Sequence, residues 1–317
     1  MNTWTRLSQA NLLEQRFRLL RSNARRALIP FVPAGDPDLG ATRDLLDTLV
    51  ACGADVIELG LPYSDPIADG PLIQAAYTRA LSRQVRVHEV LELVADWSGS
   101  RTPSAGSGVA PMTGSASAPI SPIASLRVPL VAMVSYSLIF RQSERRFVEQ
   151  CARAGFSGLI VPDLPAEEST SLAAICQAHD LGLIQLVAPT TPRYRLQAIL
   201  QQCSGFVYCV SVTGITGMRE RLPDDLRERL IGLRQLTELP LCVGFGVSRA
   251  EHARLLHPYA DAIIVGSALV ARLETAQQRP WSEVAAEIGQ FLRQLRLSLD
   301  SVSSDTASAP AEQTATQ

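Results

Sequence analysis

Short apolar runs alternate with amphipathic segments along most of the chain. The eight runs cover residues 27–32, 56–60, 130–134, 158–161, 182–187, 205–210, 241–244 and 262–265. Short, mostly apolar runs separated by helical patterns are typical of strands in a parallel sheet whose two faces are both covered. The pattern therefore predicts eight repeated βα units.

The segments between these runs place apolar residues three and four positions apart, as one buried face of a helix does. Leu226, Leu230 and Leu233 are one example. Eight alternations favour an α/β fold of the (βα)8 TIM-barrel type over a doubly wound sheet, which usually has about five or six strands. An extra helical pattern precedes the first strand, at Leu12, Leu13, Phe17 and Leu20. We expect this N-terminal helix to close the bottom of the barrel.

The regular spacing is interrupted once, between the second and third strands. Residues 98–125 are mostly Ser, Ala, Gly, Pro and Thr with almost no charge, a composition that cannot offset the entropy of ordering. We expect a flexible insertion on the N-terminal face of a single barrel domain that spans residues 1–300. Residues 301–317 have the same character and predict a disordered C-terminal tail.

Charge and hydropathy exclude several classes of partner. The 29 basic and 31 acidic residues are interspersed and leave a net charge of −2, so nothing favours binding to nucleic acid or to an anionic membrane. No apolar stretch is long enough to span a membrane, and no apolar segment follows a basic start as in a signal peptide. We therefore expect a soluble protein of the cytoplasm.

The basic residues are all arginines, because the chain contains no lysine. A Schiff-base aldolase needs an amine nucleophile, and an arginine cannot lose its proton to become one. Any aldol chemistry here must therefore be acid–base chemistry. The six cysteines show no metal-ligand spacing and mostly lie in apolar segments, so we expect buried free thiols.

Three carboxylates lie at and after the second apolar run. Glu58 stands inside that run, and Asp65 and Asp69 follow in a loop rich in Pro and Gly. Burying a carboxylate costs free energy unless it is paired or protonated, and barrel enzymes place their active sites where parallel strands end. Glu58 is therefore the first candidate for a catalytic residue. The alternative is a carboxylate that caps a helix or pairs with an arginine.

Glycine-bearing segments follow the last three apolar runs, at 213–217, 244–248 and 266–268. Glycine lets main-chain N–H groups approach an anion, and a helix that begins there adds a favourable dipole. Since all three segments fall at the same end of the barrel, they predict a phosphate site rather than three unrelated turns. The polar stretch 213–223 has the character of a lid, in which Thr216 can hydrogen-bond a catalytic carboxylate when the lid closes. A plain surface loop is the alternative.

Tyr208 lies in the sixth run, where alternation can turn its hydroxyl inward toward Glu58. A buried tyrosine that bonds a backbone carbonyl is the usual alternative. The four histidines lie in helical stretches and no cluster has metal spacing. The first run is not followed by the Gly-x-Gly-x-x-Gly turn of a nicotinamide site. We therefore expect catalysis without a metal or a cofactor.

Several of these segments together resemble one family. Residues 58–71 read Glu-Leu-Gly-Leu-Pro-Tyr-Ser-Asp-Pro-Ile-Ala-Asp-Gly-Pro, residues 34–38 read Ala-Gly-Asp-Pro-Asp, and residues 214–217 read Gly-Ile-Thr-Gly. They resemble the motifs of the tryptophan synthase alpha subunit. Further matches lie at 161–165, 188–190, 244–248 and 266–268. The resemblance runs from the first helix to Leu273, interrupted by the serine-rich insertion.

The resemblance implies a carbon–carbon lyase that cleaves indole-3-glycerol phosphate into indole and D-glyceraldehyde 3-phosphate by a retro-aldol reaction without a Schiff base. Glu58 matches the general acid–base, and Asp69 matches the carboxylate that faces the indole nitrogen. Tyr208 matches a site tyrosine. The other matches are Phe31, Ile160 and Ile264 in the indole pocket, and Gly217, Gly246, Gly266 and Ser267 at the phosphate.

The resemblance also implies a beta subunit that consumes the indole in an α2β2 tetramer, with Asp65 and Asp163 at the contact surface. The chain departs from the family after the third strand, where Ser137 aligns with the usual Asn and the usual Tyr is either displaced to a neighbouring position or lost at Ser135. Three alternatives stay open. They are a free-standing indole-3-glycerol-phosphate lyase, a catalytically weak barrel that activates a beta subunit, and another phosphate-handling barrel such as an isomerase or a condensing synthase.

Overall fold

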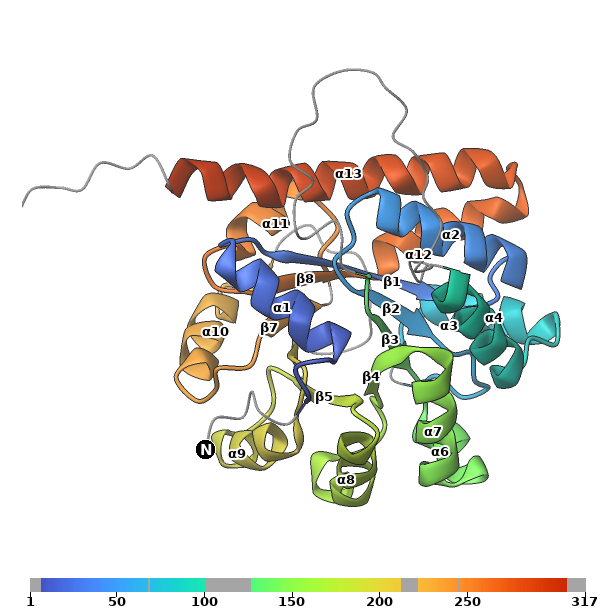
Figure 1. The fold of residues 1–317 in the computed structure, drawn as a ribbon. Helices are drawn as coiled ribbons and strands as arrows, with labels where there is room; N and C mark the ends of the chain where they lie inside the picture. Colours follow the sequence, from blue (N-terminus) through green and yellow to red (C-terminus); the bar gives the residue numbers. More distant parts are fainter. Residues whose placement is uncertain (1–6, 68, 101–126, 212–221, 245, 307–317) are drawn as a thin grey trace, which may run out of the picture.

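Eight parallel strands form a closed barrel in which each strand pairs with its neighbours in the chain, and β8 pairs with β1 (Figure 1). The computed structural model describes residues 7–67, 69–100, 127–211, 222–244 and 246–306. The strands are β1 (Ala27–Pro33), β2 (Ile57–Gly60), β3 (Leu130–Met133), β4 (Phe156–Ile160), β5 (Gly182–Val187), β6 (Val207–Val210), β7 (Leu241–Gly244) and β8 (Ala262–Val265). Each coincides with one of the predicted apolar runs, so the TIM-barrel prediction is confirmed.

Helices surround the barrel, and the long α13 packs across α2, α11 and α12 (Figure 1). The helices that the structure describes are α1 (Leu12–Ser22), α2 (Leu39–Ala51), α3 (Pro71–Ser82), α4 (Val87–Ser100), α6 (Tyr136–Gln142), α7 (Glu144–Ala154), α8 (Thr170–Ala178), α9 (Arg193–Gln202), α10 (Leu226–Arg234), α11 (Ala250–Leu256), α12 (Ser267–Glu274) and α13 (Trp281–Thr306), with short 3-10 turns η2 (Ala166–Glu168) and η3 (Thr275–Gln277). None of these helices is long and apolar enough to cross a membrane.

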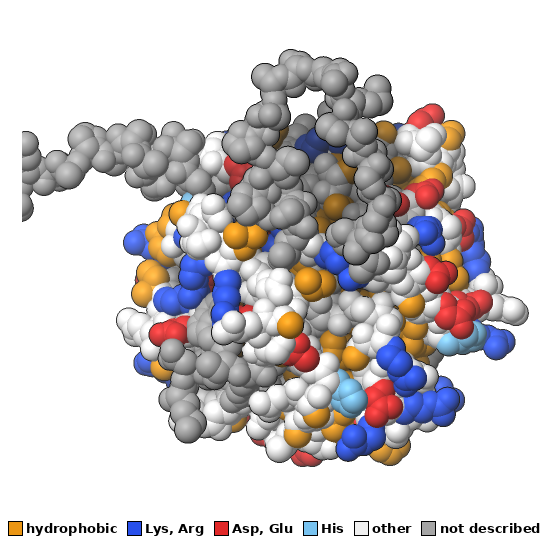
Figure 2. Space-filling model, viewed as in Figure 1, with side chains coloured by type: hydrophobic (Ala, Val, Ile, Leu, Met, Phe, Trp, Pro, Cys, Tyr) orange, Lys and Arg blue, Asp and Glu red, His pale blue; other side chains and the backbone are white. Residues whose placement is uncertain are grey.

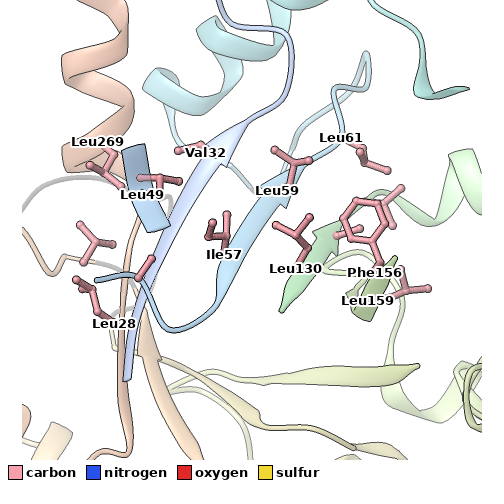
Figure 3. Close-up of a cluster of buried hydrophobic side chains, with 14 of the residues drawn as sticks. Leu28, Val32, Leu49, Ile57, Leu59, Leu61, Leu130, Phe156, Leu159 and Leu269 are labelled. Carbon is pink, nitrogen blue, oxygen red and sulfur yellow. The ribbon is translucent and has the colours of Figure 1, made fainter. Parts of the chain in front are cut away.

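Successive residues of each strand contribute to two different apolar layers, as the two-residue period of a strand requires. In β1, Leu28 and Val32 pack outward against the helices, whereas Ile29 and Phe31 join the cluster inside the barrel. Figure 3 shows the outer layer, in which strand residues such as Leu59 point toward the surrounding helices. Each fully buried aliphatic side chain contributes about 1.5–3 kcal/mol, so both layers fix the register of the barrel.

Helix α1 closes the N-terminal end of the barrel, as predicted. The Asn11 side chain caps the helix by accepting hydrogen bonds from the first-turn N–H groups. The fully buried Leu13 then reaches the beginnings of three strands. A Cβ added at Gly205 would stand 2.8 Å from the tip of Leu13, and one at Gly158 or Gly182 would stand 3.6 Å from it. The bottom of the barrel is thus filled by Leu13 in the space that the three glycines leave open.

A buried ionic cluster fastens α1 and α13 to the start of β2. The carboxylate of Asp55 accepts hydrogen bonds from Arg296 Nη1 at 2.8 Å and from the Leu28 backbone N–H at 3.0 Å. Arg16 and Arg25 approach the same carboxylate at 3.9 and 3.8 Å. Because three guanidinium groups compensate one desolvated carboxylate, this acid is satisfied by pairing. Asp55 is thus a buried acid paired with arginines, unlike Glu58 three residues later.

The surface and the cysteines agree with the sequence analysis. Acidic and basic side chains are mixed on the face shown in Figure 2, without a broad patch of one sign. All six cysteines are buried and free, as predicted. Among the described residues, no cluster of His, Cys, Asp and Glu has the arrangement of a metal site.

Two predicted boundaries are wrong by a few residues. The insertion was expected to start at residue 98, but Ser98 is buried in the last turn of α4 and its carbonyl accepts a hydrogen bond from Arg127 Nη2 at 2.9 Å. Arg16 of α1 in turn bonds the carbonyl of Arg127 at 3.2 Å, so the described ends of the insertion meet on the N-terminal face. Residues 101–125 lie outside the described residues.

The tail was expected to begin at residue 301, but α13 continues to Thr306. The apolar spacing of the helix extends to the fully buried Leu299, and the ion pair of Arg296 with Asp300 supports the last turns at an (i, i+4) spacing. Residues 301–306 are rich in serine, so their composition alone does not predict that the helix continues. Residues 307–317 lie outside the described residues.

Candidate active site

Glu58 points into the barrel. In β2 it lies opposite Phe31 of β1 on one side and Val131 of β3 on the other, and both of these belong to the interior cluster. Its neighbours Ile57 and Leu59 face outward. The Glu58 side chain is 1% exposed, and neither carboxylate oxygen has a hydrogen-bond partner among the described residues. Both alternatives, a helix cap and an arginine pair, are therefore absent from this part of the structure.

Burial in this apolar interior raises the pKa of Glu58 to about 8, and the negative charge of Asp69 adds to the rise. A carboxylate without hydrogen bonds or a cation beside it loses its hydration energy and gains nothing in return, so the protonated form is favoured. At neutral pH Glu58 therefore carries a proton. A carboxylic acid with such a pKa can both give and take a proton near pH 7.

Asp69 lies at the end of the loop that connects β2 to α3. Its side chain is 5% exposed, and Oδ2 accepts a hydrogen bond from the Tyr63 hydroxyl at 3.0 Å. Gln74 of α3 fixes the loop by donating to the carbonyls of Pro66 and Asp69 at 3.1 and 2.8 Å. Burial raises the pKa of Asp69 to about 6, while the Tyr63 hydrogen bond lowers it and the charge of Asp163 raises it further. Asp69 is mostly ionised at neutral pH.

Two buried tyrosines approach glycines of β2 and β7 closely, in the space that a Cβ would fill. A Cβ at Gly60 would collide with the hydroxyl of Tyr77 from α3 and would stand 2.8 Å from the Phe31 ring. A Cβ at Gly244 would stand 2.5 Å from the hydroxyl of Tyr208. Burial raises the pKa of Tyr208 well above its usual value, and the nearby Glu58 raises it further. Tyr208 is thus close enough to Glu58 for the two groups to interact, and the orientation of its hydroxyl toward Glu58 stays a prediction.

Tyr77 is a site residue that the sequence reasoning missed. Its side chain is fully buried, its hydroxyl has no hydrogen-bond partner among the described residues, and its ring packs against Tyr63. The available signal was the helical spacing of Ile73 and Tyr77 after Asp69, which places both on the inner face of α3. Such a face is typical of ordinary core packing, so the spacing alone does not predict a role in the site.

The predicted pocket residues come together around Glu58. Phe31, Ile160 and Ile264 are at most 3% exposed and belong to the same interior cluster, on β1, β4 and β8. Met133 of β3 joins them. The chamber around the carboxyl is therefore apolar on several sides, which is the environment that keeps it protonated.

The predicted phosphate residues after β7 and β8 lie at a left-handed glycine and at the start of a helix. Gly246 has a φ of +82°, a left-handed conformation that favours glycine. Gly266 is the N-cap residue of α12 and Ser267 its first residue, so N–H groups and the positive end of the helix dipole lie there. The third predicted glycine segment and the predicted lid cannot be compared in this way, because Thr216 and Gly217 lie outside the described residues.

The two acids expected at the partner surface lie on the C-terminal rim. Asp65 is exposed and accepts a hydrogen bond from Ser64 at 2.5 Å. Asp163, also exposed, accepts hydrogen bonds from the Tyr136 backbone N–H at 2.8 Å and from Ser135 Oγ at 2.6 Å. Asp163 therefore also holds the start of α6, where Ser135 is the N-cap residue.

Comparison with known proteins identifies the family. A sequence model described as tryptophan synthase alpha chain matches residues 17–104 and 121–296. The tryptophan synthase alpha chain of Cyanothece sp. is 45% identical over 287 residues, which cover 90% of this chain and 97% of that protein. The chain belongs to the tryptophan synthase alpha chain family. The alpha chain of Rhodopirellula baltica is 42% identical over 295 residues, with 91% and 98% covered.

Solved structures of tryptophan synthase share the fold. The alpha chain from Legionella pneumophila has a TM-score of 0.76 at 29% identity, with 93% of this chain and 99% of that chain covered. Tryptophan synthase from Mycobacterium tuberculosis gives a TM-score of 0.75 at 33% identity, with 92% and 99% covered. Residues 105–120, between the two parts matched by the family, fall inside the expected insertion. Membership makes the chain a lyase of tryptophan biosynthesis.

Proposed function

We propose that Glu58 and Asp69 carry out the alpha reaction of tryptophan biosynthesis in this chain, the retro-aldol cleavage of indole-3-glycerol phosphate into indole and D-glyceraldehyde 3-phosphate. The observation that carries the assignment is the buried carboxyl of Glu58 inside an apolar barrel, which has no hydrogen-bond partner among the described residues and a pKa of about 8. Beside it, Asp69 has a pKa of about 6. Two carboxyl groups whose pKa values differ in this way are suited to one acid role and one ionised role.

Glu58 acts first as an acid. Its proton goes to the indole carbon that bears the glycerol chain, which leaves a positive charge on the ring nitrogen. The Glu58 carboxylate then removes the proton from the hydroxyl of the adjacent side-chain carbon. As that C–O bond becomes a carbonyl, the carbon–carbon bond breaks and its electron pair returns to the ring, which restores neutral indole. Glu58 has regained its proton, so one group serves the whole cycle without a cofactor.

Asp69 stabilises the charge that develops in between. Its ionised carboxylate accepts a hydrogen bond from the ring N–H and lies where positive charge appears, so it lowers the energy of the intermediate more than that of the substrate. Phe31, Ile160 and Ile264 enclose the ring and keep water out. At the opposite side we place the phosphate on the N–H groups of the segments that follow the last three strands, at Gly217, Gly246, Gly266 and Ser267, with Tyr208 and Thr216 as supporting residues.

Replacing Glu58 tests the assignment. Glu58→Gln keeps the volume and removes the transferable proton, so we expect indole release from indole-3-glycerol phosphate to fall by about 10³-fold or more. Binding of inorganic phosphate should persist, because the glycine segments are unchanged. Retained turnover in this variant would contradict the role of Glu58.

The pH dependence should be bell-shaped. Asp69 must be ionised and Glu58 protonated in the free enzyme, so kcat/KM should fall below about pH 6 as Asp69 gains a proton and above about pH 8 as Glu58 loses one. The two limbs are properties of the interacting pair. A profile that keeps rising above pH 9 would exclude a protonated Glu58 as the reacting form.

The partner we propose is a beta subunit that takes up the released indole, in an α2β2 assembly in the cytoplasm. The rim around Asp65 and Asp163 supports this proposal because it combines exposed acids with exposed apolar residues: Ile67 is 82% and Phe140 72% exposed. One solved relative, from Pyrococcus furiosus, is described as a tryptophan synthase complex.

Adding a purified beta subunit tests the partnership. We expect turnover of indole-3-glycerol phosphate to rise and Asp65→Arg to weaken the rise, because the substitution reverses a charge on the contact surface. Full turnover without any response to the beta subunit would favour a free-standing lyase. No turnover alone, together with a beta subunit that becomes more active, would favour a pure activator.

A further inference from the structure

The carboxylate of Asp69 is held at one oxygen. Its Oδ2 accepts the hydrogen bond from the Tyr63 hydroxyl at 3.0 Å, while the backbone of the same residue is fixed by its N–H bond to the Pro66 carbonyl at 3.1 Å and by the bond from Gln74. With the backbone fixed, the Tyr63 bond determines how the carboxylate is turned. This bond uses Oδ2, so Oδ1 is the oxygen that we assign to a second hydrogen bond.

Tyr63 is itself held firmly. It is 7% exposed, and its ring packs against the ring of Tyr77 with centroids 5.3 Å apart and planes tilted by 49°. Tyr77 is fully buried and reaches across Gly60, where no Cβ could be accommodated. A phenol supported in this way has few other rotamers, so the orientation of its hydroxyl is set before any ligand binds.

We propose that Tyr63 is a positioning residue for the alpha reaction: its hydroxyl turns Asp69 so that Oδ1 meets the ring N–H, and it keeps that carboxylate ionised while the substrate is bound. This inference rests on the proposed function of Asp69. A hydrogen bond donated to a carboxylate favours its charged form, and here the donor opposes burial, which favours the neutral form.

Among the described residues, no cationic side chain perturbs the pKa of Asp69. The titratable groups of the described residues that are coupled to its charge are Glu58 of β2, Asp163 after β4, Tyr63 of the same loop, Tyr77 of α3 and Tyr208 of β6. Two are acids and three are phenols. The Tyr63 hydroxyl is therefore the donor that stabilises the ionised form, and its loss should be measurable.

The test compares Tyr63→Phe with the wild type in the pH dependence of kcat/KM for indole release. The ring and its packing remain, so we expect the acidic limb, near pH 6 in the wild type, to move to higher pH by about one unit. Below the limb, activity should fall by about tenfold, whereas the basic limb, set by Glu58, should stay in place. An acidic limb that does not move in Tyr63→Phe would overturn the proposal.

Two further variants separate positioning from packing. Tyr77→Phe keeps the ring that supports Tyr63 and leaves the bond to Asp69 intact, but it removes a second phenol that is coupled to the charge of Asp69. Its acidic limb should therefore move less than that of Tyr63→Phe. Tyr259→Phe removes a phenol that precedes β8 and lies under the guanidinium of Arg227 at 5.2 Å. This variant should leave both limbs unchanged. A limb that shifts in Tyr77→Phe but not in Tyr63→Phe would contradict the role given to Tyr63.

A second readout does not depend on turnover. In protein labelled with 13C at aspartate carboxyl groups, the Asp69 resonance, assigned by its loss in Asp69→Asn, should titrate at higher pH in Tyr63→Phe than in the wild type. If the wild type releases no indole, the proposed function fails while this titration still tests the Tyr63 bond. If the wild type is active and the titration is the same in both proteins, the Tyr63 inference alone fails.

Discussion

The loss of hydration around the Glu58 carboxyl is the constraint on which the rest of the site depends. The two-residue period of β2 turns this side chain into the barrel, and register places it between Phe31 and Val131. Helix α1 closes the end of the barrel below it with Leu13. The same packing that stabilises the barrel thereby buries the carboxyl without a hydrogen-bond partner among the described residues, and a carboxyl in that position retains its proton near pH 7.

The two carboxyl groups differ because their neighbours differ. Glu58 has no hydrogen-bond partner among the described residues, whereas Asp69 has the Tyr63 hydroxyl. Asp55 shows the third outcome, since the barrel bottom supplies it with arginines. One fold thus holds a buried acid in three ways: unpaired and protonated, bonded to a phenol and ionised, or paired with guanidinium groups for stability. We propose that only the first two handle a substrate.

The barrel could be predicted from the sequence because its apolar runs are separated by regular helical patterns. Glu58 could be singled out because burying an acid inside such a run costs free energy. Tyr77 could not be singled out, because its helical spacing is that of an ordinary core residue. Ser98 was expected to lie in a flexible insertion, because local composition does not report that Arg127 bonds its carbonyl. The contacts that matter at these positions join residues distant in sequence, and a local pattern contains no information about them.

The proposed chemistry depends on whether Glu58 is protonated at neutral pH, so the most direct test is to observe that proton. In protein labelled with 13C at glutamate carboxyl groups, isotope-edited infrared difference spectra between the wild type and Glu58→Gln isolate the Glu58 band. The account predicts a protonated carboxyl band at pH 7 that disappears with a midpoint near pH 8. A Glu58 carboxyl already ionised at pH 6 would contradict it.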